Sequence, residues 1–290
     1  MIHLNLLPKS LRWCLAALLV LLAACASAPE PRLFPHKPTA ITAQTDALLP
    51  TDAILLGEQH DAEAHQQIHQ QVIAHLAVRG QLGAVALEMA EAGRSTAGLK
   101  SNSTQLQVQE ALGWNNKSWP WQSYGPAVMA AVKAGVPVLG VNLPAAQMRE
   151  AMADSQLDQQ LPGPALKAQQ QLIRLGHCQL LPESQISPMT RIQIARDIRM
   201  ARSIAQAALP GKVVVLLAGS GHVNRLLGVP QHLPPAMKLK SVQLLAGPAR
   251  SEPDARLDAE EKAAFDAVWM TPALPERDYC KDVLQKPGAK

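Results

Sequence analysis

Five short apolar segments recur along the chain, separated by stretches with a helical pattern of hydrophobic and polar positions. The first, Ala53 to Leu56, is apolar on both faces and too short for a helix, which is typical of a strand buried in a parallel sheet. The other four segments lie at residues 83–89, 136–143, 212–218 and 241–246. Strands that alternate with helices predict βαβ crossovers. We therefore expect an α/β fold with a mostly parallel central sheet and flanking helices.

Helical spacing is clearest directly after the first predicted strand, in residues 61–79. One apolar face repeats there every four residues, at Ala64, Ile68, Val72 and Leu76. A shorter helix is expected at residues 126–134, before the third strand. Residues 145–208 look helical throughout, and we predict that they form a smaller helical subdomain inserted in the sheet domain.

The last helix of this subdomain is expected at residues 188–208, because Pro188 suits the first turn of a helix. Its apolar stripe consists of Ile194, Ile198, Ala201 and Ala205. Its arginines project from other faces and are Arg191, Arg196, Arg199 and Arg202. They form either a basic surface for the carboxylates of a ligand or an ordinary solvated helix face.

The first 24 residues have the organisation of a targeting segment. Lys9 and Arg12 precede a short apolar run, and Leu22-Ala23-Ala24-Cys25 resembles a bacterial lipobox. That resemblance implies a signal peptide at 1–24, a lipid on Cys25 and a periplasmic protein, and Ala26 implies sorting to the outer membrane. The alternative is an ordinary secretory peptide. We expect a proline-rich tether at 25–45 and the folded domain at 46–290.

Composition adds two limits. The chain has 290 residues, of which 48% are hydrophobic and 17% charged, as expected for one folded domain of moderate size with or without an inserted subdomain. The formal charge is +4, and Lys and Arg are scattered rather than gathered in a basic stripe. This distribution argues against a nucleic-acid partner.

Two cysteines, Cys178 and Cys280, remain outside the targeting segment. In an oxidising compartment they can pair and tie the middle of the chain to its C-terminal tail. Two unpaired thiols fit the sequence equally well, because spacing along the chain does not determine distance.

Titratable side chains follow the predicted strands at the points where they end. Glu58 and His60 follow the first strand, Glu88 ends the second, Asn142 lies in the third, and His222 follows the fourth. Because parallel strands bring their carboxyl ends to one edge, we expect these side chains to converge in one cleft. Both histidines stand in a Gly-x-x-His motif, and glycine allows a close approach of backbone to a ligand.

This set of two carboxylates and two imidazoles supports two kinds of chemistry. Glu58, His60, Glu88 and His222 are suitable ligands for a divalent metal. The same four side chains can instead act as a general acid and base on water, without a metal.

Aromatic residues gather in the polar region from 90 to 125, which contains Trp114, Trp119, Trp121 and Tyr124. In a chain with 3% aromatic residues, this gathering indicates either a site or lid for a flat apolar ligand or a minor core beneath an inserted loop.

His65 and His69 lie one helical turn apart, and His65 is closer to the expected cleft.

Several blocks together resemble the ChaN family of lipoproteins implicated in haem and iron uptake. They appear in order over most of residues 50–275 and comprise Leu55-Leu56-Gly57-Glu58-Gln59-His60-Asp61, Ala86-Leu87-Glu88-Met89, Gly140-Val141-Asn142-Leu143-Pro144, Gln193-Ile194-Ala195-Arg196-Asp197-Ile198-Arg199-Met200-Ala201, Ala218-Gly219-Ser220-Gly221-His222 with Gly228-Val229-Pro230, and Asp266-Ala267-Val268-Trp269-Met270-Thr271-Pro272. The resemblance implies a sheet domain with a smaller helical domain, a homodimer, haem near the dimer contact, and cooperation with components of a haem-uptake system. The motifs are also similar to those of Tiki-type metalloproteases and erythromycin esterase-like hydrolases.

We therefore expect an outer-membrane-anchored haem-binding lipoprotein, with a metal-dependent or Glu/His hydrolase as the alternative. A tyrosine phenolate can bind ferric haem. Of Tyr124 and Tyr279, we favour Tyr124 because it lies in the aromatic cluster. Trp121, His65 and Arg196 complete the predicted haem contacts.

Overall fold

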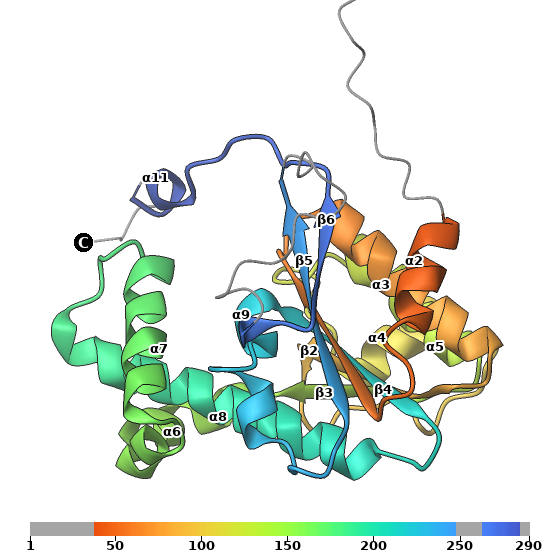
Figure 1. Ribbon diagram of the computed structural model, residues 1–290, viewed down its shortest axis with the longest axis horizontal. Helices are drawn as coiled ribbons and strands as arrows, with labels where there is room; N and C mark the ends of the chain where they lie inside the picture. Colours follow the sequence, from red (N-terminus) through yellow and green to blue (C-terminus); the bar gives the residue numbers. More distant parts are fainter. Residues whose placement is uncertain (1–37, 248–262, 285–290) are drawn as a thin grey trace, which may run out of the picture. The chain divides into compact units, whose positions relative to one another are not determined.

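The computed structural model describes residues 38–247 and 263–284 (Figure 1). One six-stranded sheet runs through it in the order β3-β2-β4-β1-β5-β6, and every neighbouring pair is parallel. The strands are β1 (Ala53–Glu58), β2 (Leu82–Glu91), β3 (Val138–Asn142), β4 (Val213–Gly219), β5 (Leu239–Ala246) and β6 (Ala267–Thr271). The predicted α/β fold is confirmed, and β6 is a strand that the hydrophobic pattern did not predict.

Helices cover both faces of the sheet. One face carries α2 (Pro38–Asp46), α3 (Glu63–Val78), α4 (Gln105–Leu112) and α5 (Trp121–Lys133). The other face carries α8 (Glu183–Ala207), α9 (Ser220–Val223) and the 3₁₀ turn η5 (Val229–His232). None of the described helices is long and apolar enough to cross a membrane.

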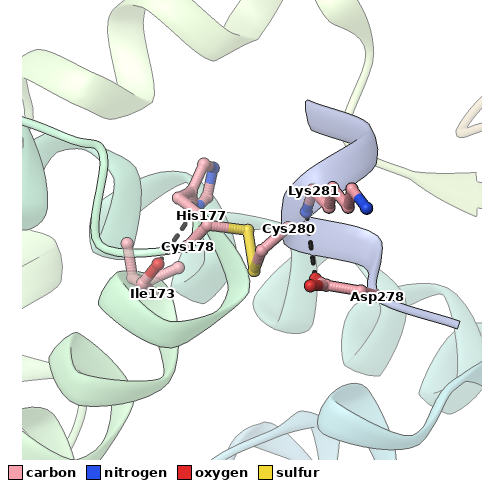
Figure 2. The surroundings of a disulfide bond; sticks show 6 residues. All are labelled: Ile173, His177, Cys178, Asp278, Cys280 and Lys281. Atoms are coloured by element: carbon pink, nitrogen blue, oxygen red, sulfur yellow. Dashed lines mark hydrogen bonds between the residues drawn. A yellow bond between two sulfur atoms is a disulfide. The ribbon is translucent and has the colours of Figure 1, made fainter. Parts of the chain in front are cut away.

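The predicted helical region is present and packs on α8. It contains η3 (Ala145–Gln147), α6 (Met148–Ala153), η4 (Ser155–Gln159) and α7 (Gly163–Gly176). Beyond the sheet, α11 (Tyr279–Leu284) follows β6. Cys178, between α7 and α8, is bonded to Cys280 in α11, with their Cα atoms 5.4 Å apart (Figure 2). Of the two possibilities that the sequence left open for these cysteines, the structure has the disulfide.

Three local predictions are wrong at particular residues. Residues 38–45, expected in the tether, belong to α2, where Ile41 and Thr45 are buried. Helix α8 begins at Glu183, so Pro188 lies inside the helix rather than at its start. Helix α5 likewise begins at Trp121, before the predicted start at residue 126. The signal peptide, Cys25 and the rest of the tether lie outside the described residues.

The two-residue period of a strand decides which side chains face which helices. In β1, Ile54 and Leu56 pack with α3 and α5, whereas Ala53 and Leu55 pack in the core that includes α8. Strand β2 alternates in the same way, with Leu87 on the α3 and α5 side and Ala86 on the α8 side. By this alternation Glu58 points to the side of α3 and α5, and Glu88 points to the side of α8.

Gly57 allows the end of β1 to approach α9 closely. A methyl group at this position would lie 2.9 Å from Ser220 Cα and would also overlap the Val223 side chain. We expect Gly57→Ala to lower the free energy of unfolding by about 1–3 kcal/mol because the buried site has no room for the added carbon. Chemical denaturation measures the change.

Gly98→Ala is the matched control for this substitution. A methyl group at Gly98 meets nothing within 4 Å, so its effect should stay within about 0.5 kcal/mol. Equal stability of Gly57→Ala and Gly98→Ala would contradict the close packing of β1 against α9.

Candidate functional site

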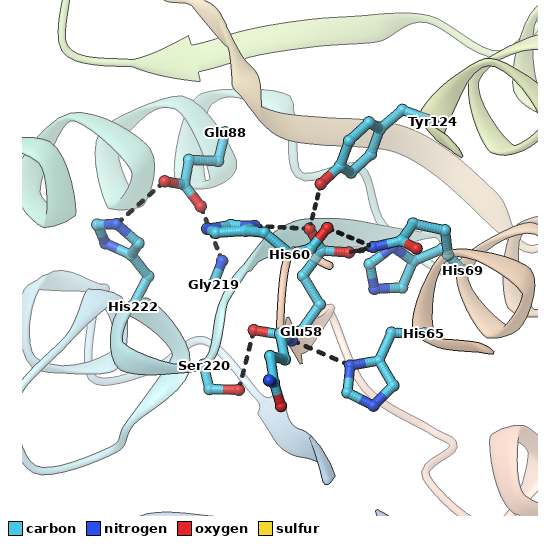
Figure 3. Close-up of polar contacts among 11 residues, drawn as sticks. Glu58, His60, His65, His69, Glu88, Tyr124, Gly219, Ser220 and His222 are labelled. Carbon is cyan, nitrogen blue, oxygen red and sulfur yellow. Dashed lines mark hydrogen bonds and ion pairs between the residues drawn. The ribbon is translucent and has the colours of Figure 1, made fainter. Parts of the chain in front are cut away.

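The four predicted side chains meet at the carboxyl edge of the sheet (Figure 3). Glu58 ends β1, Glu88 lies near the end of β2, His60 follows β1, and His222 lies in α9 directly after β4. Two pairs form there: His60 Nδ1 is 2.7 Å from Glu58 Oε1, and His222 Nε2 is 3.4 Å from Glu88 Oε1. The predicted convergence of distant segments at one edge is confirmed.

Glu58 is a fully buried carboxylate surrounded by hydrogen-bond donors. Tyr124 donates its hydroxyl to Oε1 over 2.6 Å, and Gln66 donates its amide to Oε2 over 3.0 Å. His69 Nδ1 lies 3.5 Å from Oε2. A buried carboxylate requires partners of this kind because loss of water is costly for a charge. The donors come from α3 and α5, which lie on the face of the sheet toward which Glu58 points.

His60 is the exposed member of the site, with 41% of its side chain accessible. Its Nδ1 is held by Glu58, and its ring makes an edge contact with Trp119 at a centroid distance of 4.9 Å. Nε2 points toward Gly219, where a Cβ atom would lie only 3.0 Å away. Partial burial lowers the pKa of His60, but its hydrogen bond to Glu58 and the charge of Glu88 outweigh this effect, so the pKa is raised overall.

Glu88 belongs to a second buried chain of polar groups on the α8 side. The Gly219 amide donates to Glu88 Oε2 over 2.7 Å, and His222 Nδ1 lies 2.5 Å from Asp197 Oδ1 in α8. Gln193, one turn before Asp197, places its amide nitrogen 3.1 Å from the same imidazole nitrogen. His222 therefore lies between two carboxylates, one from the sheet and one from a helix.

Burial and neighbouring charges shift the pKa values of His222, Glu88 and Asp197. Burial lowers the pKa of His222, but Glu88 and Asp197 together raise it to about 10. Burial alone would raise the pKa of Glu88, whereas the charge of His222 and its hydrogen bond lower it to about 2. Burial raises the pKa of Asp197 to about 6 in spite of His222. An imidazolium between carboxylates is the resulting state at neutral pH.

The family model described as haem-binding uptake, Tiki superfamily, ChaN, matches residues 45–233. The chain belongs to the ChaN family. Among solved structures, ChaN of Campylobacter jejuni, described as showing cofacial haem binding, is 25% identical, with a TM-score of 0.60 over 72% of this chain and 87% of its own. The type III effector HopBA1 is 17% identical, with a TM-score of 0.45 over 86% of this chain and 100% of its own. No curated protein matches.

Three predicted haem contacts of this ChaN-family chain are buried inside the protein: Tyr124, Trp121 and His65. Tyr124 is 1% exposed, and its pKa is raised far above the usual range by burial and by the Glu58 charge. Trp121 is buried and donates its indole N–H to Gln105. His65 is buried between the Gln59 amide and Thr271, 2.9 Å from the Thr271 hydroxyl. The structure does not place these three side chains on a surface that a haem can contact.

Most of the aromatic cluster is a minor core over the Glu58 side of the sheet. Trp121 packs edge-on against Trp114 at 5.0 Å, and Tyr124 packs edge-on against Trp119 at 5.9 Å. Trp114 also donates its indole N–H to the Trp119 carbonyl over 2.8 Å. Of the two interpretations of this region, the core is the one observed for Trp121 and Tyr124, while half-buried Trp119 lies against His60.

The predicted metal site is absent from the described residues: no group of three or more His, Cys, Asp or Glu side chains there is arranged to hold an ion. The alternation of the strands turns Glu58 toward α3 and α5 and Glu88 toward α8, so each carboxylate pairs with a different histidine, and the Glu88 charge also acts on His60. Asn142 does not join them, since its Oδ1 accepts from the Leu143 amide.

The predicted surface of four arginines on α8 is divided among different contacts. Arg191 pairs with Asp158 over 2.6 Å, and Arg199 donates to Gln147 over 3.1 Å. Arg196 is half-buried, with Nε enclosed and without a hydrogen-bond partner among the described residues. Arg199 and Arg202 line one cavity, whereas Arg191 is paired with Asp158.

Asp197 was missed as a site residue although its position in the sequence carries a signal. The buried face of α8 passes through Ile194, Asp197, Ala201 and Ile204, whereas the predicted stripe residues Ile198 and Ala205 are only half-buried. An aspartate at an apolar position of a helix requires a buried partner. His222 is that partner.

We expect Asp197→Asn to lower the pKa of His222 measured by NMR of the imidazole ring, because the variant loses one of two carboxylates that stabilise the imidazolium. The folded pKa of about 10 lies above the ordinary value of 6.5. The stabilisation it provides is therefore complete below about pH 6.5 and is lost as pH rises toward 10. Unfolding free energy should fall less steeply over that interval in the variant.

Asp158→Asn serves as the control. Asp158 pairs with Arg191, which lies on α8 as Asp197 does, but Asp158 makes no ion pair with His222. It should leave the His222 titration unchanged. An unchanged His222 pKa in Asp197→Asn as well would contradict the buried pair.

Proposed function

We propose that this protein binds haem in haem or iron uptake. Membership of a haem-binding uptake family supports the proposal, as does likeness to a C. jejuni protein described as binding haem cofacially. The observation on the molecule that carries it is an exposed apolar surface beside an exposed tyrosine.

The apolar side chains of this surface lie close to Cys178 and Cys280 along the chain. Large hydrophobic side chains that are 45–51% exposed gather within eight residues of the two cysteines along the chain: Leu172, Leu175, Leu180 and Tyr279. We call these four side chains the disulfide surface. Exposed apolar side chains scattered singly need no explanation, but a group at one place marks a binding surface. A porphyrin is flat and apolar, and its iron requires an axial side chain.

Tyr279 is better placed than Tyr124 to supply that axial group. Its hydroxyl donates to Asp61 Oδ2 over 2.6 Å and accepts from Gln59 Nε2 at 3.2 Å, just beyond the end of β1. Arg277 lies over its ring, 5.3 Å from the centroid. The hydrogen bond to Asp61 raises the pKa of Tyr279, whereas the hydrogen bond from the Gln59 amide lowers it and would remain available to a phenolate oxygen. Tyr279 therefore replaces Tyr124 in the proposed haem site.

The remaining parts of the proposal concern assembly and location. Two copies of the chain, each presenting the disulfide surface, fit a dimer that stacks two haems, since cofacial binding is described for the relative. The lipobox-like sequence at Cys25, followed by Ala26, supports a lipid on Cys25 and an anchor in the outer membrane, and the family supports exchange of haem with other uptake components.

A second candidate function is acid–base hydrolysis at His60. One specific observation favours it: an exposed imidazole whose Nδ1 is held by a buried carboxylate, leaving Nε2 directed to the edge of the sheet. Orientation of a histidine by a buried carboxylate is how hydrolases prepare a general base. The cavity beside His60 is lined by Asp61, Glu63, Gln66, Gln122 and Ser123.

We expect Tyr279→Phe to weaken binding of ferric haem at least tenfold and to change the Soret and visible bands of the complex, because the axial oxygen is lost. Absorbance titration of the purified protein measures both. Tyr124→Phe should keep the wild-type bands. If Tyr124→Phe changes the spectrum and Tyr279→Phe does not, the axial assignment is wrong.

For the hydrolase candidate, we expect His60→Ala to abolish turnover of an activated ester such as a p-nitrophenyl ester, and Glu58→Gln to reduce it at least a hundredfold because the imidazole loses its anchor. His75→Ala is the control, since His75 pairs with Asp46 over 2.8 Å away from the strand ends. Equal turnover in His60→Ala and His75→Ala would exclude His60 as the base.

A further inference from the structure

The C-terminal arm, which we define as residues 272–281, carries Tyr279 and has little buried surface. After β6 ends at Thr271, residues 272–279 are exposed apart from half-buried Leu274, and Cys280 is half-buried. Burial of apolar side chains therefore contributes little to holding this arm against the rest of the protein.

Within the part of the chain that the structure describes, the disulfide and the hydrogen bonds of Tyr279 hold the far end of the arm. Cys280 is bonded to Cys178 (Figure 2). The neighbouring Tyr279 makes its two hydrogen bonds to Asp61 and Gln59. Within the arm, the Lys281 amide donates to Asp278 over 3.0 Å. The disulfide joins residues 102 positions apart, so it connects the arm to the helical region covalently, whereas the hydrogen bonds of Tyr279 are exposed to water. Exposed polar contacts of that kind are weak.

We propose that the Cys178–Cys280 disulfide is a redox switch that determines whether Tyr279 is held at the haem site. This inference rests on the proposed haem-binding function. Oxidised, the bond ties Cys280, the neighbour of Tyr279, to Cys178, which Leu175 and Leu180 flank along the chain. Reduced, the arm retains only its end at Thr271 as a covalent attachment to the sheet.

The chemistry of the switch is thiol–disulfide exchange with a dithiol. A thiolate of the dithiol attacks one sulfur of the Cys178–Cys280 bond, and the second thiol of the reductant then resolves the mixed disulfide. Two electrons and two protons pass to the protein, which gains two thiols, while the dithiol becomes a disulfide. Both cysteines are half-buried rather than enclosed, so an attacking group can reach them.

Chain statistics indicate how far release moves the tyrosine. Seven residues, including Pro272 and Pro275, lie between Thr271 and Tyr279. A Gly-rich segment of eight steps would have a root-mean-square end-to-end distance of roughly 15 Å, and the prolines make this segment more extended than that. The phenol is then no longer fixed beside the disulfide surface, and its effective concentration at the haem site falls.

The experiment is a ferric haem titration of the full chain in the disulfide form and after reduction by a phosphine, with thiol counting to verify each state. We expect reduction to weaken haem binding at least tenfold, and Cys178→Ser/Cys280→Ser to bind as weakly as the reduced protein. The double variant must not respond to the phosphine, which controls for effects of the reductant on haem itself.

Tyr279→Phe separates positioning from general destabilisation. If the disulfide acts by holding Tyr279, reduction of Tyr279→Phe causes no further loss of affinity. A tenfold loss in Tyr279→Phe as well would overturn the proposed role, because the bond would then act through another group. Unchanged affinity of the reduced wild-type protein would overturn the switch while leaving the haem function intact. Absence of haem binding by the oxidised protein would instead overturn the proposed function.

Discussion

Burial of the Glu58 carboxylate is the constraint on which the arrangement at the sheet edge depends. A charge that has lost its water must be surrounded by donors, and this one receives hydrogen bonds from Tyr124 and Gln66 and pairs with His60. These partners come from α5, α3 and the loop after β1, so the carboxylate fixes three elements relative to one another. Tyr124 is buried and donates its hydroxyl to Glu58, so this hydroxyl is not available to a ligand at the surface.

The alternation of strand residues explains why the polar groups at this edge extend toward both faces of the sheet. Glu58 and Glu88 come from neighbouring regions of the sheet edge but point to opposite faces, one toward α3 and α5 and the other toward α8. His60 lies between them, bonded to Glu58 and close to Gly219, whose amide donates to Glu88. Each carboxylate thus has its own histidine, and a buried ion pair of this kind fixes geometry more than it adds stability.

Much of this could be predicted from the sequence, and the failures have physical causes. Parallel strands force their ends to one edge, so the meeting of Glu58, His60, Glu88 and His222 follows from the hydrophobic pattern. The face to which each side chain points depends on register, which is why the predicted metal site separates into two pairs. The position of Tyr124 among tryptophans favours it as a haem ligand, but a cluster of aromatic residues is equally suited to packing inside a protein. The pairing of Cys178 with Cys280 and the exposure of Tyr279 depend on contacts between segments 102 residues apart, which spacing does not reveal.

The central claim is that haem is held outside the sheet edge, at the disulfide, while the Glu58 network stays closed beneath it. A crystal structure of the disulfide-bonded protein with ferric haem tests this most directly. The account predicts iron bonded to the Tyr279 oxygen, a porphyrin face against Leu175 and Leu180, and the hydrogen bond from Tyr124 to Glu58 intact. Iron bonded to Tyr124 or to His60, with the Glu58 network opened, would contradict it.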